Sequence, residues 1–235
     1  MKVLLINGSP HQDGCTNRAL EEIVSVFNSE GIDSEIIWIG NKDIRGCISC
    51  GKCSKLEKCV FDDIVNEVSE KLKDSDGLVI GSPVYYASAN GTLISFLDRL
   101  FYSKSYSLKM KVGASVVSCR RGGNTATFDE LNKYFTISEM PVASSTYWNM
   151  VHGFSKEDVE KDLEGLQTMR NLAKNMSFMI KSIELGKKEL GIPEITIRTY
   201  NVRFLGSPIR AFTALRPSRV SLNDLQPCSA LWLTP

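Results

Sequence analysis

Four cysteines in one short stretch are the residues of this chain most able to carry redox or metal chemistry. They are Cys47, Cys50, Cys53 and Cys59, in the segment GCISCGKCSKLEKC. Their spacing is C-x2-C-x2-C-x5-C, and the first three repeat the compact spacing that wraps a cubane iron–sulfur cluster. The fourth departs from the ferredoxin pattern, because five residues separate it from the third and Val60 follows it where a ferredoxin has proline.

Two other interpretations of the cysteines stay open. Zinc is the weaker one, since zinc sites usually use two well-separated pairs of ligands. Free or redox-active thiols are the other, because spacing alone does not establish a metal site. The chain has seven cysteines, and we interpret the isolated Cys15, Cys119 and Cys228 as structural or incidental.

A second group of polar residues follows the apolar run KVLLIN at the start of the chain. In GSPHQDGCTN, Gly8 and Gly14 permit tight backbone turns. Ser9, Thr16 and Asn17 offer hydroxyl and amide donors next to the first amides of an expected helix. This arrangement predicts an anion site at a helix N-terminus.

The type of anion follows from what this loop lacks. No G-K-[ST] arrangement is present, so a nucleoside triphosphate is not expected, and no G-x-G-x-x-G fingerprint is present for a dinucleotide. A loop of neutral donors suits a stable phosphate monoester such as that of FMN. The alternative is an ordinary strand–helix turn with a cap.

Two later loops are expected at the same place. GSPVYYASANG begins with a rigid turn at residues 81–83 and then presents backbone amides and flat side chains at residues 84–86. SCRRGGNTAT has glycines that let a backbone approach a ligand closely. Arg120 and Arg121 are candidates to meet an anionic nicotinamide phosphate or an acidic electron donor; the alternative is a solvated turn.

The elements that position these loops follow from the hydrophobic pattern. Short apolar runs, typical of buried strands, alternate with segments of helical spacing. We expect Thr16 to cap the first helix and Asp62 or Asp63 to cap the second. Strands are expected at residues 2–7, 34–39, 77–81 and 111–119 and within 140–151, and helices at 16–29, from 62 or 63 to about 72, at 92–102, near 125–135 and at 155–190.

This alternation predicts an α/β fold with a parallel sheet and helices on both faces. Five strands in about 190 residues fit a flavodoxin-like doubly wound domain with strand order 2-1-3-4-5, which binds ligands at the carboxyl ends of its strands. We place this domain at residues 1–193, with a cysteine-rich loop at 46–60. Residues 194–235 contain scattered prolines and show no sustained period, so an irregular, extended C-terminal arm is expected there.

Composition narrows the function classes. The chain has 235 residues, is 43% hydrophobic and 23% charged, and has a net charge of +1, as in ordinary globular proteins. The near-neutral charge, with no long Lys/Arg run, argues against a nucleic-acid binder that works by bulk charge. We expect no signal peptide and no membrane span, because no apolar stretch reaches about 18 residues. We therefore expect a cytoplasmic protein.

Taken in order, the segments NGSPHQDGCTN, GCISCGKCSKLEKCVFDD, GSPVYYASANGTLISFLDR and SCRRGGNT resemble the NADPH-dependent FMN reductase-like flavoproteins, and within them the iron–sulfur flavoprotein branch. The resemblance covers roughly residues 1–200. It implies a flavodoxin-like fold, bound FMN and redox activity, and the cysteine spacing matches a [4Fe–4S] site of that branch. Carried over by position, it implies phosphate contacts from Ser9, His11, Thr16 and Asn17, ring contacts from Pro83, Val84, Tyr85 and Tyr86, and a loop over the flavin edge with Ser118, Arg120, Gly122 and Gly123.

The function that we expect is FMN-dependent reduction of a quinone, a free flavin or a similar small acceptor at the expense of NAD(P)H. If the cluster is present, ferredoxin becomes the favoured electron donor. No catalytic side chain is expected, because the flavin ring carries the chemistry. The family also implies a homodimer or homotetramer. The alternative is a flavodoxin-like electron-transfer protein without its own substrate, although flavodoxins are strongly acidic and this chain is not.

Overall fold

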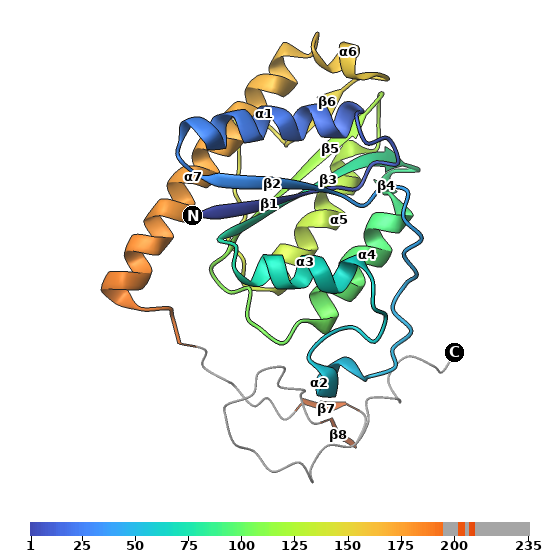
Figure 1. Ribbon diagram of the computed structural model, residues 1–235, viewed down its shortest axis with the longest axis vertical. Helices are drawn as coiled ribbons and strands as arrows, with labels where there is room; N and C mark the ends of the chain where they lie inside the picture. Colours follow the sequence, from blue (N-terminus) through green and yellow to red (C-terminus); the bar gives the residue numbers. More distant parts are fainter. Residues whose placement is uncertain (195–201, 205–206, 210–235) are drawn as a thin grey trace. The chain divides into compact units, whose positions relative to one another are not determined.

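Five parallel strands form the central sheet, in the order β2-β1-β3-β5-β6, which is the predicted flavodoxin-like order (Figure 1). The computed structural model describes residues 1–194, 202–204 and 207–209. The strands are β1 (Lys2–Asn7), β2 (Asp33–Trp38), β3 (Gly77–Tyr85), β5 (Val112–Cys119) and β6 (Met150–His152). A two-residue strand that was not predicted, β4 (Ser88–Ala89), pairs antiparallel with the end of β3.

Helices cover both faces of the sheet (Figure 1). The longer ones are α1 (Cys15–Ser29), α3 (Ile64–Lys73), α4 (Gly91–Ser103), α5 (Asn124–Ile137) and α7 (Leu163–Leu190). Two four-residue helices, α2 (Cys53–Leu56) and α6 (Lys156–Val159), lie in connections. Successive residues of a strand point to opposite faces, and on β1 Val3 and Leu5 join the core under α1 and α7, whereas Leu4 and Ile6 join the core under α3, α4 and α5.

Two expected elements differ in detail from the structure. Gly14, not Thr16, is the N-cap of α1, and Thr16 lies inside the helix with 1% of its surface exposed. The helix expected at residues 155–190 is two helices, because Asp162 starts α7 by accepting a hydrogen bond from the Gly165 amide at 3.0 Å. Ser155 does cap α6, in a capping box with Asp158.

The last strand is shorter than expected. Within residues 140–151, only Met150 and Val151 belong to β6, while Val142 forms an isolated bridge with Gly113. By contrast, the prediction for α3 is confirmed: Asp63 is its N-cap and accepts a hydrogen bond from the Val65 amide at 3.1 Å.

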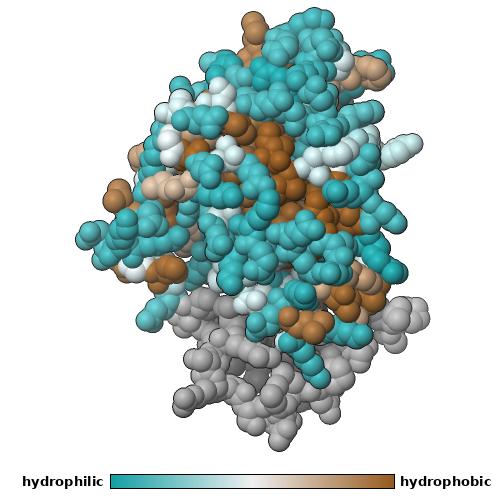
Figure 2. Space-filling model, viewed as in Figure 1, coloured by the Kyte–Doolittle hydropathy of each residue, from teal (hydrophilic) through white to brown (hydrophobic). Residues whose placement is uncertain are grey.

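The edge strand β2 is the least covered part of the sheet. Its apolar residues Ile36 and Ile37 are only half-buried. Figure 2 shows apolar surface gathered in the middle of this face of the molecule, surrounded by hydrophilic surface. An apolar edge strand is a surface on which another chain can pair.

The residues group into two units, Met1–Glu189 and Leu190–Pro235. In the second unit, β7 (Val202–Phe204) and β8 (Ser207–Ile209) pair antiparallel. The rest of the arm expected at residues 194–235 lies outside the described residues, and the boundary at residue 193 stays a prediction. Within the described ranges, no helix is long and apolar enough to cross a membrane.

Candidate functional site

The carboxyl ends of the three central strands bring the three predicted loops together. The Gly8 amide, after β1, donates a hydrogen bond to the Gly81 carbonyl of β3 at 2.9 Å. The hydroxyls of Thr16 and Ser118 lie 2.8 Å apart, which joins the start of α1 to the end of β5. The first loop therefore contacts both of the others, as the topology of the sheet requires.

The second and third loops contact each other through a glycine. Gly123 has a φ of +88°, and a Cβ placed there would lie 2.8 Å from the Cα of Ala87 and 3.1 Å from Val84. Only glycine adopts this conformation without strain and permits such a close approach. Gly122 and Arg120, beside it, are exposed.

The N-terminus of α1 is open to an anion. Gly14 provides no side-chain cap, and the first turn contains no acidic residue. In the part of the chain that the structure describes, the amides of Thr16 and Asn17 donate to no protein acceptor. Uncapped amides at the positive end of a helix favour anions, and the phosphate site at this loop stays a prediction.

A residue that the sequence reasoning missed shapes this loop. Asn7 is fully buried at the end of β1; its Nδ2 donates to the Gln12 carbonyl at 3.1 Å and to Asn17 Oδ1 at 3.2 Å, and its Oδ1 accepts from the Ser9 amide at 3.0 Å. Ser9 Oγ then accepts from the His11 amide at 3.2 Å. In the sequence, Asn7 could have been identified as a polar residue at the end of an apolar strand.

The side chains predicted to hold the phosphate are already engaged within the protein. Asn17 Nδ2 donates to Glu21 at 2.7 Å in addition to its bond from Asn7, and Thr16 bonds Ser118. His11 is exposed. The donors left without a protein acceptor are thus the backbone amides of the first helical turn, which these side chains hold in place.

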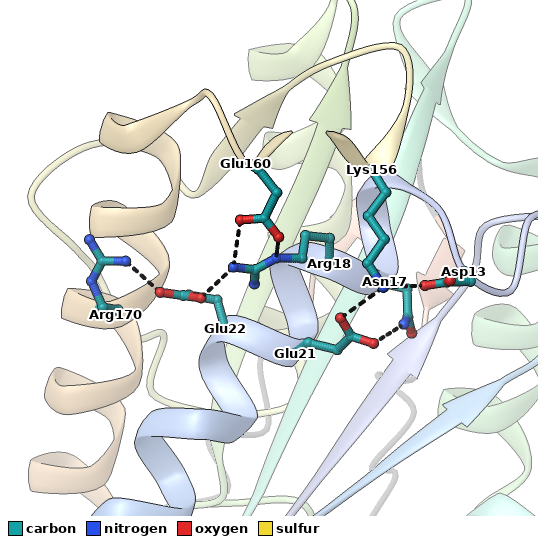
Figure 3. A network of polar contacts seen from close by, with 8 residues as sticks. All are labelled: Asp13, Asn17, Arg18, Glu21, Glu22, Lys156, Glu160 and Arg170. Atoms are coloured by element: carbon teal, nitrogen blue, oxygen red, sulfur yellow. Dashed lines mark hydrogen bonds and ion pairs between the residues drawn. The ribbon is translucent and has the colours of Figure 1, made fainter. Parts of the chain in front are cut away.

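Ion pairs fix α1 to the connection after β6 (Figure 3). Lys156 Nζ lies 2.6 Å from Asp13 Oδ1 and 3.4 Å from Glu21. The hydrogen bond to Asp13 raises the pKa of Lys156 above its usual value. One lysine therefore holds the end of the first loop against α6.

A second group of charges in Figure 3 lies on the adjacent side of the same turns of α1. Glu22 pairs with Arg18 at 2.8 Å and with Arg170 of α7, and Arg18 also pairs with Glu160. Burial alone would raise the pKa of Glu22, but hydrogen bonds from Arg170 and Arg18 outweigh it and hold the pKa below its usual value. This group stabilises the helix rather than forming a ligand site.

The residues expected to meet the flavin ring lie on the hairpin of β3 and β4. Pro83 and Val84 are half-buried, while Tyr85 is 44% exposed and Tyr86 is fully exposed. Tyr86 and Ala87 have φ values of 53° and 59°, the left-handed region that residues other than glycine seldom adopt.

The hairpin is held by Glu130 of α5, a second residue that the sequence reasoning missed. Its carboxylate accepts hydrogen bonds from the Ser88 hydroxyl at 2.9 Å and the Ala89 amide at 2.8 Å. Exposed aromatic rings on a turn that a carboxylate holds in place form a surface on which a planar ring can stack.

The four clustered cysteines line one hollow, which lies between the loop that joins β2 to α3 and the last turn of α4. Cys47 and Cys50 are exposed, Cys53 is half-buried and Cys59 is 9% exposed. The hollow, of about 20 Å³, is also lined by Arg99 and Tyr102, among others. Burial raises the pKa of the Cys53 thiol, and the neighbouring thiols raise it further.

The donors that line this hollow are four thiols, the ligand set of an iron–sulfur cluster. Among the described residues, no three histidine, cysteine or carboxylate side chains are placed to hold one metal ion. A cubane binds each thiolate to a different iron, so its ligands surround the cluster rather than converge on one point. The hollow has room for about one water molecule, so a cluster needs the exposed cysteines to move outward.

Comparison with known proteins agrees with this fold and these loops. The model of the NADPH-dependent FMN reductase family matches residues 1–155. An iron–sulfur flavoprotein of Methanocaldococcus jannaschii is 33% identical over 192 residues, covering 78% of this chain and all of the relative. Another, from Methanosarcina thermophila, is 29% identical over 188 residues, covering 78% of this chain and 97% of the relative.

Solved structures show the same fold at low identity. RosB with bound 8-demethyl-8-formylriboflavin-5'-phosphate superposes with a TM-score of 0.65 at 15% identity, covering 94% of this chain and 99% of RosB. The NAD(P)H:quinone oxidoreductase from Methanothermobacter marburgensis superposes with a TM-score of 0.59 at 15% identity, covering 75% and 96% of the two chains.

Fold and loops define a flavodoxin-like flavoprotein. The chain belongs to the NADPH-dependent FMN reductase family and, within it, to the iron–sulfur flavoprotein branch. The resemblance seen in the sequence is thereby confirmed. The general activity of the protein is FMN-dependent oxidoreduction.

Proposed function

We propose that this protein binds FMN where the three loops meet and uses it to pass electrons from a soluble donor to a small acceptor such as a quinone or a free flavin. The observation that carries the proposal is the uncapped N-terminus of α1, joined directly to the two loops that would hold a ring. FMN is favoured over FAD because the first loop offers a single anion site.

The binding roles follow from the geometry. The phosphate is held by the backbone amides of Thr16 and Asn17 at the start of α1. The side chains of Ser9, Thr16 and Asn17 hold the loop around them in place, and His11 lies at the exposed rim. The isoalloxazine ring lies against the hairpin, with Pro83, Val84, Tyr85 and Tyr86 on one side. The loop with Ser118, Arg120, Gly122 and Gly123 covers its edge.

The protein's own contribution to the reaction is binding, orientation and electrostatics. When bound, FMN supplies hydride and one-electron chemistry at its ring, and no side chain is needed as acid or base. The exposed Arg120 is a cationic contact for an anionic donor. NAD(P)H is one such donor, and a ferredoxin is the other.

The four cysteines hold a [4Fe–4S] cluster in this proposal. Cys59 anchors it from the buried side, and Cys47, Cys50 and Cys53 close around it. A one-electron carrier in the same protein as FMN makes transfer from ferredoxin the favoured route, because a flavin can exchange two electrons one at a time.

Assembly is part of the proposal. The flavin ring, with Tyr86 fully exposed, is only partly covered by one chain, and the apolar edge strand β2 is open. A homodimer or homotetramer with two-fold symmetry covers both. Light scattering at micromolar concentration checks this, and a monomer with FMN fully bound contradicts it.

The decisive experiment is an ultraviolet–visible spectrum of protein purified without oxygen, with flavin and iron assayed on the same sample. We expect one FMN and about four irons per chain, the content of one cubane. Steady-state oxidation of NAD(P)H and of reduced ferredoxin with a quinone then identifies the donor. If the protein binds no flavin, the proposed FMN site is wrong. If it binds flavin but neither donor supports turnover, the alternative of a flavodoxin-like electron-transfer protein is favoured.

A further inference from the structure

Arg99 of α4 is the largest fully buried side chain among the described residues, with 1% of its surface exposed. Two of its nitrogens bond the Asp63 carboxylate, at 2.7 and 2.8 Å. Its Nε donates to Cys59 Sγ at 3.3 Å. A cation is thus held inside the protein, against the fourth cysteine of the cluster loop.

Stability alone does not explain the contact with sulfur. Removing a cation from water costs several kcal/mol, and the paired carboxylate of Asp63 offsets that cost. A neutral thiol is a weak hydrogen-bond acceptor, so the bond from Arg99 to the Cys59 sulfur adds little stability while Cys59 is protonated. The same donor aimed at a metal-bound thiolate makes a strong, charge-assisted bond.

Among the four clustered cysteines, Cys59 is the one whose backbone amide and carbonyl both bond the same side chain. Its amide donates to Asn66 Oδ1 at 3.0 Å, and Asn66 Nδ2 donates back to the Cys59 carbonyl at 3.1 Å. Two helices therefore fix this one residue, α3 through its backbone and α4 through its sulfur. Cys47, by comparison, accepts one long bond, from the Ser49 amide at 3.4 Å.

We propose that Arg99 is a positioning residue of the metal site, which holds the Cys59 sulfur in place before the cluster enters and makes the bound cluster easier to reduce. The proposal rests on the proposed function, since it takes the cluster to be present. On reduction the cluster gains one electron and no proton, so it gains one negative charge. A fixed cation and an N–H donor at one of its sulfurs favour that state and raise the reduction potential.

A second arginine offers a matched control. Arg45 and Arg99 both lie over the ring of Phe61, at 4.7 and 5.0 Å. Arg45 is exposed, so solvent screens its charge, and the bond to the Cys59 sulfur comes from Arg99. Loss of Arg45 therefore removes one positive charge from the same loop without removing the bond to Cys59.

The test uses the full chain with Arg99→Gln combined with Asp63→Asn, so that the Asp63 carboxylate is not left without its partner and the amide oxygen introduced at position 63 still caps α3. Arg99→Lys is the second variant, since lysine keeps the charge but lacks the planar fork that spans Asp63 and the sulfur. Arg45→Gln is the control for charge. Asn66→Ala is the control for position, because it frees the Cys59 backbone and leaves the cation.

Three quantities are measured after FMN content confirms the fold. They are the midpoint potential of the cluster by anaerobic redox titration, the iron retained per chain, and the rate at which an alkylating reagent labels Cys59 in iron-free protein. We expect a lower potential in both Arg99 variants and an unchanged one in Arg45→Gln and Asn66→Ala. Labelling of Cys59 should be a few-fold faster in Arg99→Lys, which keeps the positive charge but loses the bond that holds the sulfur.

Each outcome decides part of the proposal. Potential and labelling equal to wild type in both Arg99 variants overturn it and leave Arg99 as a structural tether. Faster labelling with an unchanged potential overturns the effect on reduction alone. If wild-type protein takes up no iron even after reconstitution, the proposed cluster is wrong, and the labelling of Cys59 still decides whether Arg99 holds that sulfur.

Discussion

In the loop that follows β1, polar side chains bond to one another, whereas in the cysteine loop two of the four thiols are exposed. Asn7 ties Ser9, Gln12 and Asn17 into one network before any ligand is present. Cys47 and Cys50 have little of this support. The first loop is arranged by the fold, while the middle of the second is arranged by what binds it, as is common for metal sites.

The largest effect, on the cysteine loop alone, is expected from removing one thiol. Cys53→Ala leaves three thiolates, which cannot complete a four-thiolate site, so we expect iron to be lost entirely. FMN should stay bound at full stoichiometry, since its loops lie at the ends of other strands. Iron and flavin assays on one anaerobic sample measure both.

The same Cys53 variant separates the two donors. Transfer from reduced ferredoxin should fall steeply, whereas transfer from NAD(P)H, if it occurs, should change far less. Wild-type behaviour in both assays would show that the loop does not carry electrons.

A charge in the first loop should have the next largest effect. Asn17→Asp preserves shape and the bond accepted from Asn7, but it loses the bond donated to Glu21 and places a carboxylate beside the anion site. Two unit charges about 5 Å apart at an effective dielectric of about 20 repel by about 3 kcal/mol, so FMN should bind about 100-fold more weakly. Asn17→Ala, which adds no charge, should weaken it much less; equal affinities in all three proteins, measured by fluorescence titration, would contradict the site.

The contact between Gly40, just before the cysteine loop, and Ser9 of the first loop can be tested by adding a methyl group. In Gly40→Ala the new Cβ would lie 1.6 Å from the Ser9 carbonyl oxygen, so the backbone must move. Overpacking costs about 1–3 kcal/mol, which lowers the Tm by about 3–10 °C in a protein of this size. In the control Gly46→Ala the nearest atom is 3.9 Å away, and its Tm should match wild type.

The smallest effect is expected in the ion pairs of α1. Because the pKa of Glu22 is lowered in the folded protein, its stabilisation is present above the usual glutamate value of 4.5 and is lost as pH falls through the folded pKa. Glu22→Gln should therefore lower the Tm by a few degrees at pH 7 and by less as the solution is acidified, with FMN affinity unchanged. Glu184→Gln removes an exposed pair with Lys188 and should change neither the Tm nor its dependence on pH.

Local patterns in the sequence predict the strands and the three loops, because buried parallel strands are short apolar runs and their carboxyl ends share an edge. They fail where distant residues decide. Thr16 reads as a cap from its neighbours, but its hydroxyl bonds Ser118, which lies 102 residues away. Asp162 divides a segment that otherwise has helical spacing throughout.

The support of the cysteine site could not be predicted for the same reason. Arg99 lies in a helix whose apolar spacing gives no sign of a buried cation, and its partners Cys59 and Asp63 are 40 and 36 residues away. Spacing identifies the four thiols but not which one the protein holds.

Gly40 also has a consequence for how this chain can change over evolution. Gly40 lets one end of the cysteine loop pack directly against Ser9. At the other end, Cys59 bonds α3 and Asp63 bonds α4. Between these anchors, insertions and deletions alter only a surface loop, and the entropy of closing a longer loop grows slowly with its length. The segment can therefore lengthen, shorten or exchange its metal-binding motif among descendants while the flavin site is inherited intact.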